Sequence, residues 1–201
     1  MHVRLSGLFA LAGLAFSTPA AFGQVSVMLP NSFEVGAFAG ASYGVDQFRA
    51  MGGANVTYAI NKWILPYGEY TYFPGIVRNV PGSSSSAPYN YSVALSDFHG
   101  GVHIRIPIKE KPIVPYGVIG IGALSHFERK ITIPASGGFP PTALTVPGGA
   151  DFAVNFGGGL RYYVTQRFGF RVEAKAYKPT GAGTYGNTFG KVEGGIFIQL
   201  R

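Results

Sequence analysis

Residues 168–178 have the sequence FGFRVEAKAYK, in which charged and uncharged side chains alternate. Successive side chains of a β-strand point to opposite faces, so a strand here places Arg171, Glu173 and Lys175 on one face. Val172 and its neighbours at every second position point the other way. This period of two predicts a strand whose two faces meet different surroundings, one polar and one apolar.

The same alternation occurs in seven further segments of the chain: 32–45, 48–60, 63–73, 91–107, 113–127, 151–164 and 189–201. Each is long enough for a tilted transmembrane strand, which needs about 9–11 residues. The charged side chains that share one face of these strands are Glu34, Arg49, Glu69, Asp97, Arg105, Arg161, Arg171, Glu173, Lys175, Lys191 and Glu193. We expect no charge on the opposite face. The distribution of charges is a strict test of the strand assignment, because a register slip of one residue would exchange the two faces completely.

The connections between the segments alternate in length. The turns at 61–62, 108–112 and 165–167 are short, and the connections between them at 74–90, 128–150 and 179–188 are long. The first connection, 44–47, is the exception, since it is short but belongs to the second set. Tight turns at one end and long loops at the other are typical of transmembrane barrels, whereas a soluble β-sandwich has long loops at both ends. We therefore predict an all-β fold, an eight-stranded antiparallel up-and-down transmembrane β-barrel with long extracellular loops and short periplasmic turns.

The composition fits this fold and excludes several others. The chain has 201 residues, of which 47% are hydrophobic and 14% aromatic, and only 12% are charged, against about 25% in typical soluble domains. No run approaches the ~20 consecutive apolar residues of a membrane-spanning helix. The absence of cysteine excludes disulfide scaffolds and cysteine-based zinc sites.

The first residues have the pattern of an export signal. Arg4 supplies a positive charge, residues 5–16 form an apolar run, and small residues end at Gly23. This pattern predicts a secretory signal peptide over 1–23, cleaved before Gln24. A short buried helix is the alternative, but Pro30 and polar residues follow where a stop-transfer sequence would be needed. The mature chain, 24–201, is then a single barrel domain.

A sequence echo completes the pattern: ILPYG at 64–68 recurs as IVPYG at 113–117, each just after a short turn. We interpret it as two equivalent strand starts, where a missing proline N–H is tolerated. Together with the signal peptide and the eight strands, it resembles the small outer-membrane β-barrel family of OmpA-type barrel domains, OmpX-like proteins and opacity-type porin-family proteins. The resemblance implies location in the cell outer membrane of a Gram-negative bacterium and contact with its lipids and assembly machinery. Barrels of this family usually end on an outward aromatic residue, whereas this chain ends with Leu200 and Arg201.

The expected function follows from the lumen. An eight-stranded barrel is just wide enough to be filled by side chains, and the six basic and five acidic residues expected inside are nearly balanced. We therefore expect a self-paired polar lumen, and a structural or surface-interaction role in which the loops at 74–90 and 128–150 contact surface ligands. The alternative is a narrow porin-like channel for small solutes or ions. A lipid-modifying outer-membrane enzyme is a third hypothesis.

We expect no catalytic, cofactor or metal site. Ser125 and His126 are the candidates for a nucleophile and its base, but adjacent residues of a strand point to opposite faces. His99 and His103 share a face but lie about 13 Å apart at ~3.3 Å per residue, too far to chelate one metal ion. Asp97 and His99 are close enough to hydrogen-bond within the lumen.

Nucleic acid is not an expected partner, although the sequence pI is about 9.7. Six of the basic residues are expected inside the barrel, and no basic patch with interleaved aromatic residues is present. The cations expected on the loops are Arg78, Arg129, Lys130 and Lys178. These side chains are suited to contact lipopolysaccharide phosphates as charge-assisted pairs.

Overall fold

The computed structural model describes residues 29–43, 49–80, 89–108, 111–135, 138, 140–180 and 188–201. The predicted signal peptide lies outside these residues, as do most of the connections at 44–48 and 179–188. The strands are β1 (Ser32–Tyr43), β2 (Arg49–Ala59), β3 (Ile64–Val80), β4 (Tyr89–Arg105), β5 (Ile113–His126), β6 (Arg129–Ile133), β7 (Thr142–Val146), β8 (Gly149–Tyr163), β9 (Phe168–Pro179) and β10 (Phe189–Leu200). No helix in the described part of the chain has the length and apolarity needed to cross a membrane.

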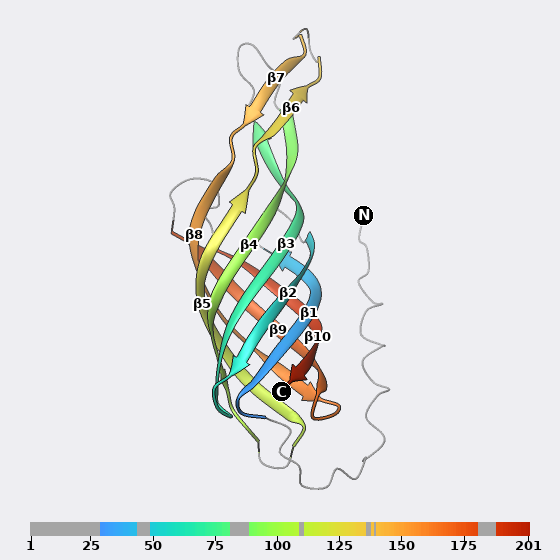
Figure 1. The fold of residues 1–201 in the computed structure, drawn as a ribbon. Coiled ribbons are helices and arrows are strands. Elements are labelled where there is room, and N and C mark those ends of the chain that lie inside the picture. The colour runs from blue at the N-terminus through green and yellow to red at the C-terminus, as the bar shows by residue number, and fades with distance from the viewer. Residues whose placement is uncertain are drawn as a thin grey trace, which may run out of the picture.

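Eight of the strands close into one barrel, in the order β1-β10-β9-β8-β5-β4-β3-β2 (Figure 1). Every neighbouring pair is antiparallel, including β1 with β10, which closes the barrel. Closure satisfies the backbone hydrogen bonds between strands and leaves no free edge in the barrel wall. The predicted eight-stranded antiparallel barrel is therefore confirmed.

Two turns at one end of the barrel are built by side chains that bind the backbone. Asn61 Oδ1 accepts hydrogen bonds from the N–H groups of Trp63 and Ile64, at 2.7 and 2.9 Å. Thr165 Oγ1 accepts from the N–H groups of the two residues at 167–168, at 3.2 and 3.0 Å. Asn and Thr favour such tight turns because their side chains replace a backbone acceptor. We call this end of the barrel the turn end and the opposite one the loop end.

Two expected loops contain strands instead. β6 and β7 form a hairpin inside the expected loop 128–150, and β3 and β4 continue into the expected loop 74–90. Within the β6–β7 hairpin, Ile131 and Ile133 are buried, so alternation continues beyond the barrel. In β3 the register shifts between Phe73 and Ile76, next to Pro74, which has no N–H for the ladder. The interpretation of 129–133 and 142–146 as loop was wrong, because five-residue strands have a weak periodic signal. In the segment 74–90, the described residues at both ends belong to β3 and β4.

The barrel wall is uneven in height at the loop end. β3, β4, β5 and β8 have 17, 17, 14 and 15 residues, whereas β1, β2, β9 and β10 have 11 or 12. Figure 1 shows the β6–β7 hairpin beside the upper parts of β3 and β4, at the far end of the molecule from the C-terminus. We call β3, β4, β5 and β8 the tall wall, and β1, β2, β9 and β10 the low wall.

The outward face of the barrel is apolar on every strand. Exposed large apolar side chains, one from each barrel strand, include Phe33, Val56, Tyr70, Phe98, Ile121, Phe156, Val172 and Ile196. One charge contradicts the expectation of an uncharged outer face: Lys178, which was expected on a loop, belongs to β9 and is exposed on its outward face. It lies at the loop end, where a cation on the outer face of a barrel costs only about 0–1 kcal/mol.

Candidate functional site

The lumen is the candidate site, because the charged residues of the sequence gather there. The side chains buried inside the barrel include Glu34, Glu69, Asp97, Arg105, Arg161, Arg171, Glu173, Lys175, Lys191 and Glu193. The side chain of Arg49 lies outside the described part of the structure. We call these ten residues the charge layer. Most of them lie in the middle of the barrel and at its turn end, whereas Asp97 lies closer to the loop end, opposite Leu124.

Like charges face one another across the strands that carry this layer. In the register of β9 and β10, Lys175 lies opposite Lys191 and Glu173 lies opposite Glu193. Directly opposed like charges destabilise a sheet. The arrangement therefore needs counter-charges from elsewhere in the barrel.

Glu69 supplies the main counter-charge from the other side of the lumen. Lys175 Nζ donates to both carboxylate oxygens of Glu69 at 2.8 Å, and Lys191 Nζ donates to Oε1 at 2.7 Å. Lys191 also donates to Thr71 Oγ1 at 2.8 Å. One carboxylate on β3 thus holds two ammonium groups from β9 and β10, which links the two walls through the lumen.

The remaining charges of this cluster are paired along the strands. Lys175 lies 2.6 Å from Glu173 Oε1, and Lys191 lies 2.9 Å from Glu193 Oε2. Arg171 Nη2 donates to Glu193 Oε1 at 2.9 Å. Because each carboxylate meets at least one cation within 3 Å, the charges within the cluster compensate one another.

Arg161 organises a second group nearer the turn end. Its Nη1 donates to both oxygens of Glu34, at 2.5 and 2.6 Å, and its Nη2 lies 2.9 Å from His103 Nδ1. Because a guanidinium only donates, Nδ1 of His103 must accept, which places the ring proton on Nε2. The guanidinium also lies over the ring of Tyr116, at 4.9 Å from its centroid.

Two tyrosines of the repeated sequence belong to the same group, which sequence reasoning missed. His103 stacks on Tyr67, with ring centroids 4.4 Å apart, and tilts against Tyr116 at 5.0 Å. Tyr67 donates its hydroxyl proton to Asn155 Oδ1 at 3.0 Å, and Tyr116 donates to Glu173 Oε2 at 2.5 Å. The echo ILPYG and IVPYG was the available signal: it marks two equivalent strand starts, and it also places two phenols at similar positions inside the barrel.

Glycines on the inner face make room for these long side chains. A Cβ added at Gly120 would lie 2.3 Å from the Tyr67 hydroxyl oxygen. A Cβ at Gly159 would lie 2.7 Å from the Tyr116 hydroxyl oxygen. Small residues opposite large ones are a general way to fill a narrow barrel.

Arg105 and Asp97 are held differently from the other charges. Arg105 donates to the carbonyl oxygens of Asn61 and Lys62, at 2.8 and 3.1 Å, so it fixes a turn and not a carboxylate. Asp97 pairs with His99 Nδ1, as the sequence suggested. The second ring nitrogen of His99 meets the carbonyl oxygen of Ala153 at 3.2 Å.

Three carboxylates of the charge layer come close enough to hold a metal ion. Oxygens of Glu69, Glu173 and Glu193 lie within 4.8 Å of one another. Lys175 and Lys191 lie 2.6–2.9 Å from oxygens of the same three groups. The positive charge that a metal would bring is already supplied by the two ammonium groups, so the cluster is better suited to ion pairing.

The lumen changes character toward the loop end. A cluster of buried apolar side chains there contains one residue from each of the eight barrel strands: Phe38, Met51, Phe73, Leu95, Leu124, Ala153, Tyr177 and Phe189. Tyr177 and Phe189 stack with ring centroids 4.8 Å apart, and Phe73 meets Phe189 edge to face at 6.2 Å. We call these eight residues the apolar layer. It borders the charge layer directly, since Lys191 Nζ and the Arg171 guanidinium lie 4.7 and 5.0 Å from the centroid of the Phe38 ring.

A smaller apolar cluster lies at the turn end. Val114, Tyr163 and Phe197 are each at most 1% exposed and pack together. These three side chains pack beside the charges at this end: Arg105 Nη1 donates to the Tyr163 hydroxyl at 3.3 Å, and the Arg161 guanidinium lies 5.4 Å from the centroid of the Phe197 ring. Burial of this kind keeps the ion pairs away from bulk water and strengthens them.

Comparisons with known proteins agree with this architecture. No family model matches the chain, and no curated protein matches it. Among solved structures, Neisserial surface protein A is 14% identical with a TM-score of 0.58, and the match covers 83% of this chain and 96% of that one. The N-terminal β-barrel domain of OprF from Pseudomonas aeruginosa is 16% identical with a TM-score of 0.50, covering 85% and 98%. The chain therefore has the fold of the small eight-stranded outer-membrane β-barrels.

Proposed function

We propose that this chain is an integral protein of the Gram-negative outer membrane, in which a closed barrel holds two β-hairpins above the membrane for interactions outside the cell. The two hairpins are β6–β7 and the upper part of β3–β4. The apolar outward face supports the membrane location, since such a surface around a whole barrel has no stable place in water. Outer-membrane lipids, including lipopolysaccharide, and the assembly machinery are the partners that this location requires.

The apolar layer is the observation that carries the closed-barrel part of the proposal. Its eight members are each at most 6% exposed, and they come from all strands of the barrel. Apolar constrictions exclude water, and an ion cannot shed its hydration shell there without a large cost in free energy. The alternative, a narrow channel for small solutes, would need this layer to open.

The hairpins are the part of the molecule best placed to meet a partner. The β6–β7 hairpin has an exposed face, with Lys130 and Thr132 on β6 and Ala143 and Thr145 on β7. It projects beyond the barrel on the tall wall, as Figure 1 shows. A surface ligand would contact this exposed face, while the barrel fixes its position.

Catalysis is not part of the proposal. Ser125 donates to the carbonyl oxygen of Ser96 at 3.4 Å, and His126 Nε2 contacts the carbonyl oxygen of Pro147 at 3.1 Å. The two side chains have different partners, so His126 does not activate the Ser125 hydroxyl in this arrangement. An altered acyl pattern of lipid A in cells that produce the protein would contradict this part of the proposal.

Single-cysteine labelling tests the proposal directly, because the chain has no cysteine of its own. We expect Thr132→Cys, in the β6–β7 hairpin, to react with a membrane-impermeant maleimide on intact cells. The matched control is Gln166→Cys at the turn end, which should react only after the outer membrane is permeabilised. Both variants should show heat-modifiable gel migration in the outer-membrane fraction. Labelling of Gln166→Cys alone on intact cells, or a protein found only in the soluble fraction, would overturn the proposal.

A further inference from the structure

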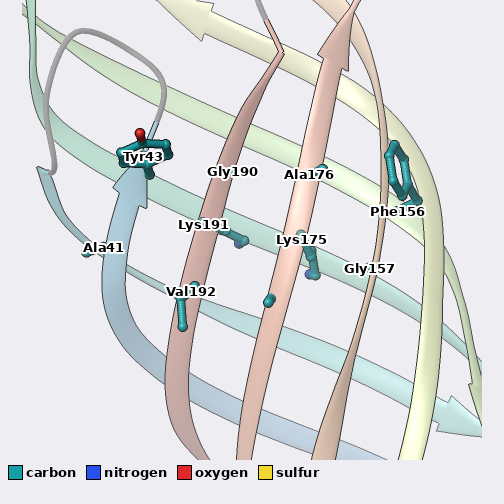
Figure 2. A pocket seen from close by; sticks show the side chains of 10 residues that line it. Ala41, Tyr43, Phe156, Gly157, Lys175, Ala176, Gly190, Lys191 and Val192 are labelled. Atoms are coloured by element: carbon teal, nitrogen blue, oxygen red, sulfur yellow. The ribbon is translucent and has the colours of Figure 1, made fainter.

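A hollow lies on the outward face of the barrel near the loop end, where the low wall meets β8 of the tall wall. The hollow has a volume of about 500 Å³ and lies across β1, β10, β9 and β8. Figure 2 shows its borders: Tyr43 on one side, Phe156 on the other, and Val192 between them. Its floor consists of small residues, including Ala174 and Ala176 on β9. We call this hollow the outer groove.

The outer groove is separate from the charged lumen. Lys175 and Lys191 border it through the wall, but both are buried inside the barrel, and their ammonium groups donate to Glu69. Figure 2 shows both side chains on the far side of the ribbon from Tyr43 and Phe156. The groove therefore offers an apolar surface only, and a charged anchor for a ligand has to come from the rim.

Lys178 provides a cation at this rim. It follows Ala174 and Ala176 on the outward face of β9, two residues closer to the loop end. Two residues of a strand span about 7 Å, at ~3.4 Å each. Among the barrel positions whose side chains the structure describes, Lys178 is the one charge that faces outward. An apolar groove below a single cation matches an amphiphile with an acyl chain and an anionic head group.

We propose that the outer groove binds one acyl chain of lipopolysaccharide, with a phosphate of its head group on Lys178. This inference rests on the proposed function, which places the loop end of the barrel in the outer leaflet. The volume lies within the range of roughly 300–1,000 Å³ that is usual for ligand sites. The aromatic side chains of Tyr43 and Phe156 project from the barrel on either side of the groove and give an acyl chain two apolar surfaces to pack against.

A second copy of the chain fits the groove less well. A symmetric dimer brings the same surface of both molecules together, so two hollows would face each other and leave a void. The same contact would bring two Lys178 ammonium groups toward one another in an apolar environment, which is unfavourable. A lipid with a phosphate fills the hollow and compensates the charge at once.

Native mass spectrometry of the full-length barrel, extracted in mild detergent and incubated with purified rough-type lipopolysaccharide, tests the proposal. We expect one bound molecule per barrel. Lys178→Gln removes the cation and should weaken binding about tenfold or more, the effect of losing one charged hydrogen bond. Ala174→Phe fills the groove and should weaken binding to a similar extent, because the acyl chain no longer has room there. The matched controls are Ala54→Phe, on the outward face of β2, and Lys111→Gln, at the turn end, which should bind as the unchanged protein does.

Three results would overturn the proposal: equal binding by all variants, equally tight binding of phosphatidylglycerol, or a dimer cross-linked through the groove. Heat-modifiable migration of each variant shows whether it is folded. A barrel that reaches the outer membrane but retains no lipopolysaccharide contradicts the groove alone. A barrel absent from the outer membrane contradicts the proposed function.

Discussion

The charge layer and the apolar layer both fill the lumen of the barrel, but they do so with different interactions. The charge layer fills the barrel with directional contacts, in which Glu69 holds two lysines and Glu34 holds Arg161. The apolar layer fills it with close packing, such as the stack of Tyr177 on Phe189. The first links the walls and sets their register, whereas the second excludes water. Substitutions in the two layers should therefore have different consequences.

Removing the shared carboxylate should have the largest effect. We expect Glu69→Leu to lower the free energy of unfolding by about 3–5 kcal/mol, because Lys175 and Lys191 then face one another with too little counter-charge. Urea unfolding in detergent micelles measures this change. The double variant Glu69→Leu with Lys191→Leu removes one of the two opposed ammonium groups and should recover part of the loss. A Glu69→Leu barrel as stable as the unchanged protein would break the distinction between the layers.

A substitution in the apolar layer should cost somewhat less stability and change a different property. Phe189→Ala removes a ring packed against Phe73 and Tyr177, which we expect to cost about 3 kcal/mol. It also opens the layer to water, so ion leakage across lipid vesicles should rise. Glu69→Leu, by contrast, should leave vesicles tight, since the apolar layer is intact. Equal leakage from both variants would show that the apolar layer is not the part of the lumen that excludes water and ions.

Glycine-to-alanine substitutions test how tightly the lumen is packed, because each adds a single methyl group. Gly120→Ala should destabilise the barrel by about 1–3 kcal/mol, because its Cβ would lie 2.3 Å from the Tyr67 hydroxyl in a filled lumen. Gly68→Ala is the matched control, since nothing lies within 4 Å of the added Cβ. Thermal unfolding of the two variants side by side measures the difference. Similar stabilities of the two variants would mean that the lumen can accommodate a methyl group beside the Tyr67 hydroxyl, contrary to the close packing described above.

The sequence was sufficient to predict the barrel. The ten residues of the charge layer are among the eleven expected in the lumen, and the side chain of the eleventh, Arg49, lies outside the described part of the structure. The alternation of side chains along a strand assigns Arg171, Glu173 and Lys175 to one face, and this assignment does not depend on the neighbouring strands. It does not say which charges meet, because the contact of Glu69 with Lys175 depends on strands far apart in the chain. The pairing across the lumen therefore needed the three-dimensional structure.

Two other features were beyond the reach of sequence patterns, for different reasons. The apolar layer takes a single residue from each strand, and only the strand register brings Leu95 and Phe189 to one height. The β6–β7 hairpin lies in a segment rich in Pro, Gly and Thr, where five-residue strands have little periodicity to detect. Lys178 was expected on a loop, although the predicted strand 168–178 already contained it, and β9 places it on the outward face.

Single-channel recording tests the central claim, that the barrel is a closed anchor, most directly. The protein is inserted into a planar bilayer, with the double variant Phe73→Ala and Phe189→Ala as the comparison. We expect no conductance from the unchanged barrel and measurable openings from the variant, whose apolar layer is incomplete. Discrete, reproducible openings of the unchanged barrel would contradict the claim and favour the channel.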